Sequence, residues 1–579
     1  MSTGRTTARR VAPVLLAAAA LASGSTMLHA QTKARLNQYG YPEKLTPKPT
    51  VAAITQADLM TRLYQFADDS MMGREAGQPG NNKGTAYIAR ELKRLGIEPA
   101  GDNGTYFQNM PGTGVYSIGP STLSAGGRQL AWMKDFVVSP TQIAPKTLTG
   151  VPVIFGGVQG DTVNELKPGQ AEGKIVVMLP AVPSQGGGGR FGGAGRGGQP
   201  QRANPTAGAL AVAMVNLDGV SSDMLERLTN PPNVTVRGEP QTSIALRLSG
   251  EGASALFGGR SLKELPVGTM GSNIDAQLNY RFDYRGDNAR NVVGIIRGSD
   301  PKLRGQYVAI GAHNDHIGSG PKVDHDSAFA WRHVQMKMTI RNADTIRALT
   351  PEERASIHIN VDSLHRIRPA RLDSIANGAD DDGSGSMAVL EIAEAIAKAP
   401  VKPKRSIIFV WHTGEEKGLI GSGYFTQHPT VPKDSIVAQI NIDMIGRGRA
   451  EDLPGGGPDY LGVVGANRLS ADLGMMVTNV NKKQAKPLKL DDRYDQDVTK
   501  TLGGSYNNIY GRSDHYNYAK LGIPIAFFFT GLHGDYHQTT DEPQYIDYPH
   551  YARITNYIKD LLVEVGNNPK RPAVTMPIQ

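Results

Sequence analysis

Two adjacent glutamates, Glu415 and Glu416, follow a run of apolar residues at positions 407–410. Neighbouring carboxylates repel one another, and a charge near a buried strand is costly unless it is paired or binds a metal ion. A hydrolytic zinc site needs carboxylates for two tasks, because one binds the metal and another takes a proton from the attacking water. The pair is therefore a candidate for a metal ligand beside a general base.

Other apolar runs of the C-terminal half are also followed by histidines or acids: His313, Asp315, residues 380–382, Asp443, His533 and His537. In open α/β sheets, the functional crevice lies at the carboxyl ends of the strands. Two histidines, one bridging carboxylate and two terminal carboxylates would fit two zinc ions about 3.5–4 Å apart. The chain contains no cysteine, so any metal must be held by His, Asp and Glu.

The elements that must position these residues form an alternating pattern. After about residue 278, apolar runs suited to buried strands alternate with helical patterns such as residues 384–399, and two further helical patterns lie between residues 54 and 95. This alternation predicts an α/β domain with a mixed, mostly parallel sheet.

Taken in order, the segments around these residues resemble the secreted di-zinc aminopeptidase family, which includes bacterial leucyl aminopeptidases, aminopeptidase Y and relatives of the glutamate carboxypeptidases. The resemblance covers about residues 50–110 and 285–565, and rests on GAHNDHIG, NGADDDGSGSMAVLEIAEA, WHTGEEKGLIGSGYF, NIDMIGR and RSDHYNYAKLGIPIAFFFTGLHGDYHQTTDEPQYID. It implies a zinc-exopeptidase α/β/α sandwich that releases N-terminal amino acids from peptides.

The resemblance also implies a role for each matching residue. Glu415 would be the general base, Asp315 the acid that orients the ring of His313, and Tyr536 a hydrogen-bond donor to the oxyanion. The peptide bond between Asp381 and Asp382 would be cis. Two Zn²⁺ ions would be bound, with Asp381 as the bridge, by His313, Asp381, Glu416, Asp443 and His537.

The order of segments predicts four parts of the chain. Residues 1–30 have the basic start, short apolar stretch and small residues of a signal peptide. Residues 131–270 are rich in Val, Gly, Pro and Thr, and loosely resemble a mainly β protease-associated domain inserted into a peptidase domain formed by residues 31–130 and 271–579. Within these parts we expect a loop at the glycine-rich residues 186–202 and a partly helical cap beside the metal site at the insert 317–377.

Composition narrows the class of partner. A net charge of +8 on 579 residues is small, and it implies no nucleic-acid partner. No segment after the signal peptide is apolar over 18 residues, so we expect no stable membrane insertion. The sequence therefore predicts an exported protein, periplasmic or extracellular, that acts on peptides.

Other functions stay open at this point. Arg447 and Arg512 lie near motif residues and could bind a terminal carboxylate, so a carboxypeptidase of the same fold is an alternative. Glutaminyl cyclases of this fold work with one zinc ion and lack the first histidine, so His313 argues against them. A non-catalytic binding ectodomain would be expected to lose ligands. A serine hydrolase built on residues 513–515 would need a geometry that adjacent side chains rarely reach.

Overall fold

The computed structural model describes residues 36–575 with the exception of residues 112, 140–145, 162, 181–203, 219, 221–224, 226–233, 237–243, 285–288, 342–348 and 494–508. The predicted signal peptide, residues 1–30, and the predicted glycine-rich loop, residues 186–202, lie outside the described residues.

The larger domain is built on a nine-stranded sheet of order β1-β15-β19-β16-β20-β23-β21-β22, with β2 also paired to β15. The central strands β19, β16, β20 and β23 run parallel to one another, whereas β15 and β21 are antiparallel to their inner neighbours. This is the α/β class with a mixed sheet that the sequence predicts. The strands are Glu98–Pro99 (β1), Phe107–Asn109 (β2), Arg290–Ile296 (β15), Tyr307–His313 (β16), Ser406–His412 (β19), Ile436–Ile442 (β20), Tyr460–Val464 (β21), Lys489–Asp491 (β22) and Ile525–Phe529 (β23).

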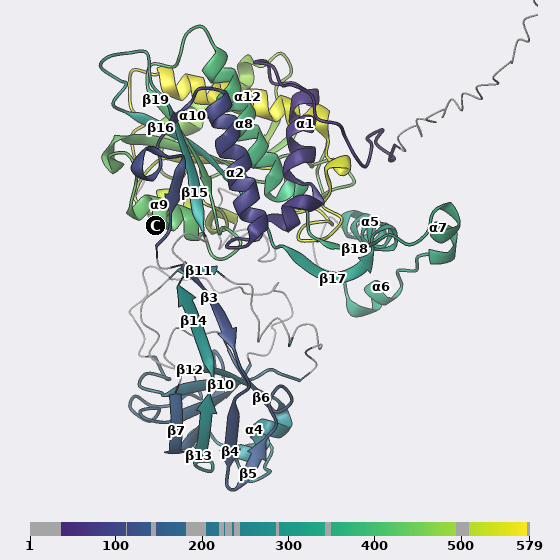
Figure 1. Cartoon of the computed structure of the whole chain (residues 1–579), viewed down its shortest axis with the longest axis vertical. Helices are drawn as coiled ribbons and strands as arrows, with labels where there is room; N and C mark the ends of the chain where they lie inside the picture. Colours follow the sequence, from purple (N-terminus) through teal and green to yellow (C-terminus); the bar gives the residue numbers. More distant parts are fainter. Residues whose placement is uncertain are drawn as a thin grey trace, which may run out of the picture.

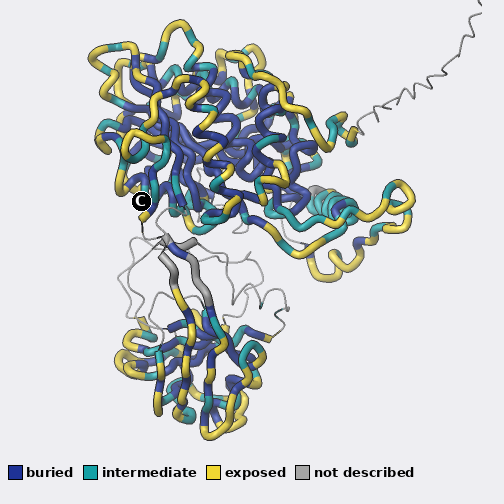
Figure 2. The backbone as a smooth tube through the Cα atoms, in the orientation of Figure 1, coloured by how far each residue is buried: buried dark blue, intermediate teal, exposed yellow. Residues whose placement is uncertain are grey.

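Helices pack against both faces of this sheet (Figure 1). Val308 and Ile310 belong to the core on one face, whereas Tyr307 and Ala309 belong to the core on the other, as the pleat of a strand requires. Because both faces are covered, the central strands are buried along their length, as Figure 2 shows. The first face carries Gln56–Phe66 (α1), Pro79–Arg94 (α2), Gly385–Lys398 (α8), Ala471–Lys483 (α10) and Tyr548–Asn567 (α12), and the second carries Ile420–Gln427 (α9) and His515–Ala519 (α11).

Residues 113–284 contain a second group of strands with a hydrophobic core of its own. The paired strands β3 and β14 lead from the α/β domain into this region (Figure 1). Its strands extend beyond the predicted limits of 131–270, and its assignment as a protease-associated domain stays a prediction. The elements are Thr113–Ile118 (β3), Thr122–Ala125 (β4), Arg128–Leu130 (β5), Phe136–Val138 (β6), Lys146–Val151 (β7), Val153–Val158 (β8), Ile175–Leu179 (β9), Ala211–Val215 (β10), Val234–Val236 (β11), Ile244–Leu248 (β12), Gly250–Leu256 (α4), Ile274–Leu278 (β13) and Tyr280–Tyr284 (β14).

In its described residues, the insert 317–377 forms an arm made of an antiparallel ribbon and three helices. The ribbon pairs β17 with β18, and Figure 1 shows it leading away from the α/β domain. The arm therefore contains helices as the sequence predicts, while its role as a cap stays a prediction. Its elements are Ser319–Asp324 (β17), His325–Arg341 (α5), Pro351–Ala355 (α6), Val361–Ile367 (α7) and Leu372–Ile375 (β18).

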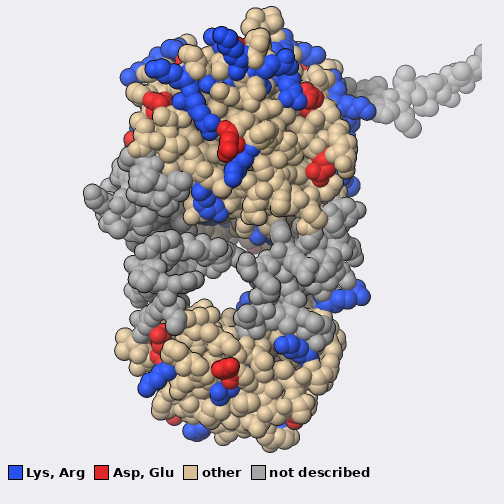
Figure 3. Space-filling model, turned by 90° about the vertical axis from the view of Figure 1, so that its left-hand side faces the viewer, with Lys and Arg blue, Asp and Glu red and all other residues tan. Residues whose placement is uncertain are grey.

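On the face drawn in Figure 3, the Lys and Arg side chains gather at the end of the α/β domain that points away from the β-rich region. Among the described residues, none of the helices combines the length and the apolar character that a bilayer crossing requires.

Candidate active site

The central strands bring the candidate residues to one edge of the sheet. β16 ends at His313, and β20 ends directly before Asp443. The loop after β19 carries Glu416, the loop after β23 carries His537, and Asp381 lies in the turn that precedes α8. Because the carboxyl ends of adjacent parallel strands meet at the same edge, side chains far apart in the sequence converge there.

Ligand-type atoms gather in two groups that share Asp381, and within each group these atoms all lie within 4.8 Å of one another. Oδ1 of Asp381 lies 3.0 Å from Nε2 of His313, and Oδ2 lies 3.1 Å from Nε2 of His537. A carboxylate placed between two groups in this way is suited to bridge two metal ions. One group consists of His316, Asp381, Glu416 and His537, and the other of His313, Asp381 and Asp443; we call these six residues the metal-ligand cluster.

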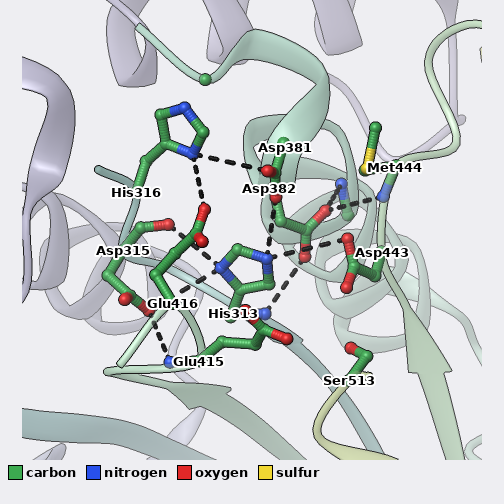
Figure 4. Close-up of polar contacts among 12 residues, drawn as sticks. His313, Asp315, His316, Asp381, Asp382, Glu415, Glu416, Asp443, Met444 and Ser513 are labelled. Atoms are coloured by element: carbon green, nitrogen blue, oxygen red, sulfur yellow. Dashed lines mark hydrogen bonds and ion pairs between the residues drawn. The ribbon is translucent and has the colours of Figure 1, made fainter. Parts of the chain in front are cut away.

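His316 is the member of this cluster that sequence reasoning missed. Its Nδ1 lies 3.0 Å from Oε1 of Glu416 and 3.6 Å from Oδ2 of Asp381 (Figure 4). The signal that could have found it is its place three residues after His313, in the same strand-end segment. The sequence does not show which of the two histidines faces the acids, because no periodic pattern continues beyond the end of a strand.

The unpaired polar atoms of the cluster test whether it fits a metal. Nε2 of His313, Nδ1 of His316, Oε1 of Glu416 and Nε2 of His537 are buried and have no hydrogen-bond partner among the described residues, although carboxylate oxygens lie 3.0–3.1 Å from the ring nitrogens. These four atoms belong to residues of the two groups in which the ligand-type atoms all lie within 4.8 Å of one another, a spacing that a shared metal ion can span. Imidazole nitrogen and carboxylate oxygen are ligands that zinc takes, so the residues present fit zinc.

Excess negative charge marks the same place. Burial by itself lowers the pKa of His537, but Asp381 and Glu416 raise it to about 10. Burial likewise opposes protonation of His313, yet Asp443, Asp315 and Asp381 hold its pKa well above the usual value. The carboxylates thus draw positive charge to this point, whether as protons or as metal ions.

Glu415 belongs to neither group of ligand atoms. Figure 4 shows its side chain directed toward the side of Ser513, whereas the side chain of Glu416 points toward His316. Burial raises the pKa of Glu415 well above its usual range, and the carboxylates of Glu416 and Asp443 add to this effect. The structure therefore places the two adjacent glutamates in different surroundings, with one among the ligand atoms and the other beside them.

Asp315 contacts His313 mainly through its main chain. Nδ1 of His313 lies 3.0 Å from the carbonyl oxygen of Asp315 and 3.7 Å from its Oδ1. The carboxylate instead accepts hydrogen bonds from the backbone N–H groups of Gly414, at 2.8 Å, and Glu415, at 3.2 Å. In this structure the Asp315 carboxylate holds the loop that carries the paired glutamates, and its carbonyl orients the ring.

Asp382 serves the framework of the site. Its carboxylate accepts hydrogen bonds from the backbone N–H groups of His313, Gly385 and Met444, at 3.1, 2.8 and 3.2 Å. It thereby ties together the end of β16, the start of α8 and the residues after β20. The peptide bond between Asp381 and Asp382 is cis.

A pocket opens beside the group formed by His313, Asp381 and Asp443. Tyr536 lines this pocket, its ring stacks on that of His537 at 3.8 Å between centroids, and its hydroxyl accepts a hydrogen bond from Nη2 of Arg512 at 3.0 Å. Apolar residues form about half of the walls, and the lining residues are Asp381, Glu415, Asp443, Met444, Ile509, Arg512, Ser513, Phe527, Phe529, Leu532 and Tyr536.

The remaining candidate residues have partners of their own. Arg447 is buried, and its Nη2 lies 2.7 Å from Oδ1 of Asp452 and 3.1 Å from Oδ2 of Asp535. Ser513 accepts a hydrogen bond from Asn441 at 2.9 Å, while Nε2 of His515 lies 2.7 Å from the carbonyl oxygen of Tyr510. The described contacts therefore place Ser513 and His515 with other partners and not with each other as in a serine-hydrolase triad.

Comparison with known proteins agrees with this reading of the site. Residues 291–562 match Peptidase family M28. Leupeptin-inactivating enzyme 1 of Streptomyces exfoliatus is 31% identical over 192 residues, which cover 30% of this chain and 34% of that protein. An aminopeptidase of Pseudomonas aeruginosa PAO1 is 24% identical over 414 residues, which cover 69% of this chain and 60% of that protein. The chain thus spans between about a third and three fifths of the length of these two relatives.

Solved structures give a weaker likeness. The aminopeptidase from Aneurinibacillus sp. strain AM-1 aligns with a TM-score of 0.48 and 17% identity, over 91% of this chain and 97% of that one. The zinc aminopeptidase of Bacillus subtilis aligns with the same TM-score and the same identity, over 92% and 100%. The family match spans the stretch from β15 to α12 and includes every residue of the metal-ligand cluster. The part of the α/β domain that carries the metal-ligand cluster therefore matches Peptidase family M28.

Proposed function

We propose that the α/β domain is a zinc-dependent aminopeptidase that uses two zinc ions. The observation that carries this proposal is the position of Asp381 between two groups of ligand atoms, with Glu415 outside both groups. Relatives named leucine aminopeptidase, zinc metalloprotease and aminopeptidase support it.

Metal ions of this kind, when bound, lower the pKa of a water molecule to about 7 and polarise the carbonyl of the scissile peptide bond. His316, His313, Glu416, Asp443 and His537 would hold the two ions on either side of Asp381. The carboxylate of Glu415 takes the proton of the attacking water and passes it to the leaving nitrogen, a task for which a carboxylate with a raised pKa is suited. The hydroxyl of Tyr536 donates to the carbonyl oxygen as negative charge develops on it.

The charges around the pocket favour the amino end of a peptide. Asp381 and Asp443 line the pocket as proposed zinc ligands, so among the acids of its wall Glu415 remains to attract a free α-amino group. Arg447, which a carboxypeptidase could use to bind a terminal carboxylate, is paired with two acids and does not line the pocket. We infer that the apolar part of the wall receives the side chain of the N-terminal residue.

A carboxypeptidase is the second candidate, and Arg512 is the observation that favours it. This side chain is exposed and lines the pocket, so its guanidinium could bind a terminal carboxylate. Its hydrogen bond to Tyr536 supports a different role, in which it orients the phenol hydroxyl. We place the aminopeptidase first for this reason.

We further propose that the protein is exported through its N-terminal segment and acts on peptides in the periplasm or outside the cell. The support for this proposal is the basic start and the short apolar stretch of residues 1–30. Signal-peptide cleavage is tested by N-terminal sequencing of the protein recovered from the periplasm or medium of an expressing cell.

The decisive experiment compares a leucyl peptide with its N-acetylated form, using the full chain with zinc added. We expect release of leucine from the free peptide and none from the acetylated one. Shortening of the acetylated peptide from its carboxyl end would establish the carboxypeptidase instead. Binding of the free peptide without any cleavage would favour a binding ectodomain.

A further inference from the structure

We propose that His316 is a direct metal ligand and that it makes the two metal sites unequal. In this arrangement one ion has four protein ligands, from His316, Asp381, Glu416 and His537, and the other has three, from His313, Asp381 and Asp443. The proposal rests on the proposed function and adds to it a ligand and an order of metal affinity.

The contacts of His316 are those of a ligand. The residue is fully buried, and neither of its ring nitrogens has a hydrogen-bond partner among the described residues. The buried His550 of the same domain also has no ring partner among the described residues, but it belongs to no group of ligand atoms. His316 differs because its Nδ1 lies 3.0 Å from Oε1 of Glu416 and 3.6 Å from Oδ2 of Asp381. A buried imidazole without a partner loses the hydrogen bonds that water would provide, and at His316 a cation shared with these carboxylates would compensate for part of that loss.

The backbone fixes the position of this ring. The N–H of His316 donates to the carbonyl oxygen of Arg74 at 3.2 Å, and His316 forms a β-bridge with Glu75. On its other side lies Gly378, where a Cβ atom would come within 2.5 Å of Cγ of the ring. The ring is therefore held between the segment after α1 and the turn that carries Asp381, a rigid setting of the kind that a metal ligand requires.

The two groups of ligand atoms also differ in their access to the pocket. Of the residues that the two groups do not share, Asp443 lines the pocket, whereas His313, His316, Glu416 and His537 do not, and Glu416 and His537 are partly exposed. A zinc site closed by four protein ligands is typical of a structural role, and a site with three ligands keeps a position for water or substrate. The four-ligand ion would therefore be held more firmly, and the three-ligand ion would keep a position for water or substrate.

This inequality predicts two classes of zinc affinity in the full-length protein. We expect one equivalent to survive dialysis against a moderate chelator and the second to be lost. Mutation of a direct ligand should reduce metal affinity more than mutation of a residue that acts through a ligand. The second kind of mutation typically reduces metal affinity by about 10–100-fold.

The test compares His316→Ala with wild type in competitive titrations of zinc against a chelator of known affinity. We expect the tighter class to weaken by more than about 100-fold, beyond the range of an indirect effect, and the weaker class to change by less than threefold. His550→Ala is the matched control, because His550 is also a buried histidine but belongs to no group of ligand atoms. A loss in the tighter class of about 100-fold or less, or an equal loss in both classes, overturns the proposal.

A second variant tests whether loss of the fold, and not loss of a ligand, explains the reduced affinity. His316→Gln keeps most of the side-chain volume, and circular dichroism of both variants reports whether the fold persists. X-ray absorption of protein loaded with one equivalent of zinc should then show two imidazole ligands in wild type and in His550→Ala, and one in His316→Gln. Two imidazoles in His316→Gln would refute the assignment of His316.

The outcomes also separate this proposal from the function on which it rests. A wild-type protein that binds no zinc and releases no leucine refutes both. A wild-type protein that binds two zinc ions and cleaves peptides, with unchanged affinities in His316→Ala, refutes the role of His316 alone.

Discussion

Two clusters in this chain are made of the same side-chain types but differ in the source of their positive charge. One is the metal-ligand cluster at the edge of the sheet. The other lies at the base of the arm, where His325, Asp373 and Glu542 also place ligand-type atoms within 4.8 Å of one another; we call it the arm-base cluster. Nε2 of His325 lies 3.0 Å from Oε2 of Glu542, as close as the pairs in the metal-ligand cluster.

Arginine distinguishes the two clusters. Nη2 of Arg371 contacts Nδ1 of His325 and lies 3.4 Å from Oε2 of Glu542. Near the metal-ligand cluster, the buried guanidinium of Arg74 donates instead to main-chain carbonyl oxygens, which belong to Phe66, Asn314, Asn377 and Gly378. An arginine thus supplies positive charge to the arm-base cluster, whereas Arg74, the buried arginine near the metal-ligand cluster, is engaged with main-chain oxygens.

The largest expected effect comes from Glu415→Gln, which alters the metal-ligand cluster's neighbour without removing a ligand. Because Glu415 lies outside both groups of ligand atoms, zinc content should stay as in wild type. Loss of the base should lower kcat by about 10²–10⁴-fold. Steady-state kinetics and elemental analysis of the same preparation check both parts.

Glu416→Gln is the contrasting variant, because the two residues are adjacent and carry the same charge. It should lose zinc along with activity, since Glu416 belongs to a ligand group. If Glu415→Gln loses zinc and Glu416→Gln retains it, the two roles are exchanged.

Metal removal should expose a second difference, in the pH dependence of stability. In the metal-free protein the pKa of His537 is raised from 6.5 to about 10, mainly by Asp381 and Glu416 against the opposing effect of burial. A histidine whose folded-state pKa is raised contributes stability below its unfolded pKa and loses it as the pH rises through the folded value. The Tm of the metal-free protein should therefore fall between about pH 6.5 and about 10.

The zinc-loaded protein is the comparison for this measurement. His325 also has a raised pKa, because Asp326 and Glu542 outweigh the effect of burial, and it contributes the same sign in both forms. The difference in slope between the two forms then reports on the metal-ligand cluster. A metal-free Tm that rises over this interval would contradict the charge assignment.

The sequence was sufficient to predict the location of those residues that follow the end of a buried strand. His313, Asp443 and His537 follow apolar runs that pair side by side, so the order of parallel strands places them at one edge. His316 could not be assigned in the same way. Its ring is directed by the bridge to Glu75 and by contact with Gly378, and both are contacts between segments that are distant in sequence.

The arm shows a second feature that the sequence alone does not predict, namely which charged residues are paired. The sequence of the insert 317–377 is rich in arginine, but Arg368 and Arg371 pair with acids of the arm and the adjoining loops, among them Asp326 and Glu542. A list of charges does not say which are neutralised within the fold, because that depends on the ribbon β17–β18 bringing residues 324–326 beside residues 368–371. The same consideration separates Arg447, which is paired, from Arg512, which faces the pocket.

Arg371→Met tests whether the arm-base cluster depends on its arginine, and we expect a moderate loss of stability. Removing one partner of a buried ion pair costs about 3–5 kcal/mol, and the Arg371 side chain is 29% exposed, so we expect a loss of about 1–3 kcal/mol. Denaturant unfolding of the zinc-loaded protein measures it. Arg366→Met, which alters an exposed arginine of the same arm, should change stability by less than about 0.5 kcal/mol; equal effects of the two substitutions would mean that the arm-base cluster does not depend on its arginine.

The smallest expected effect concerns the pocket, which borders the metal-ligand cluster and contains no residue of the arm-base cluster. Leu532 lines this pocket and is 40% exposed. Leu532→Ala removes apolar contact worth about 1 kcal/mol for a partly exposed leucine, or about fivefold in kcat/KM. We expect this loss for peptides with N-terminal leucine and less of it for N-terminal alanine, whose methyl group is too short to reach the wall. Leu521→Ala is the matched control, because Leu521 is 42% exposed and does not line the pocket. An equal loss for leucine and alanine would mean that Leu532 acts through the neighbouring loop of His537, and the apolar wall would then not be the site of the N-terminal side chain.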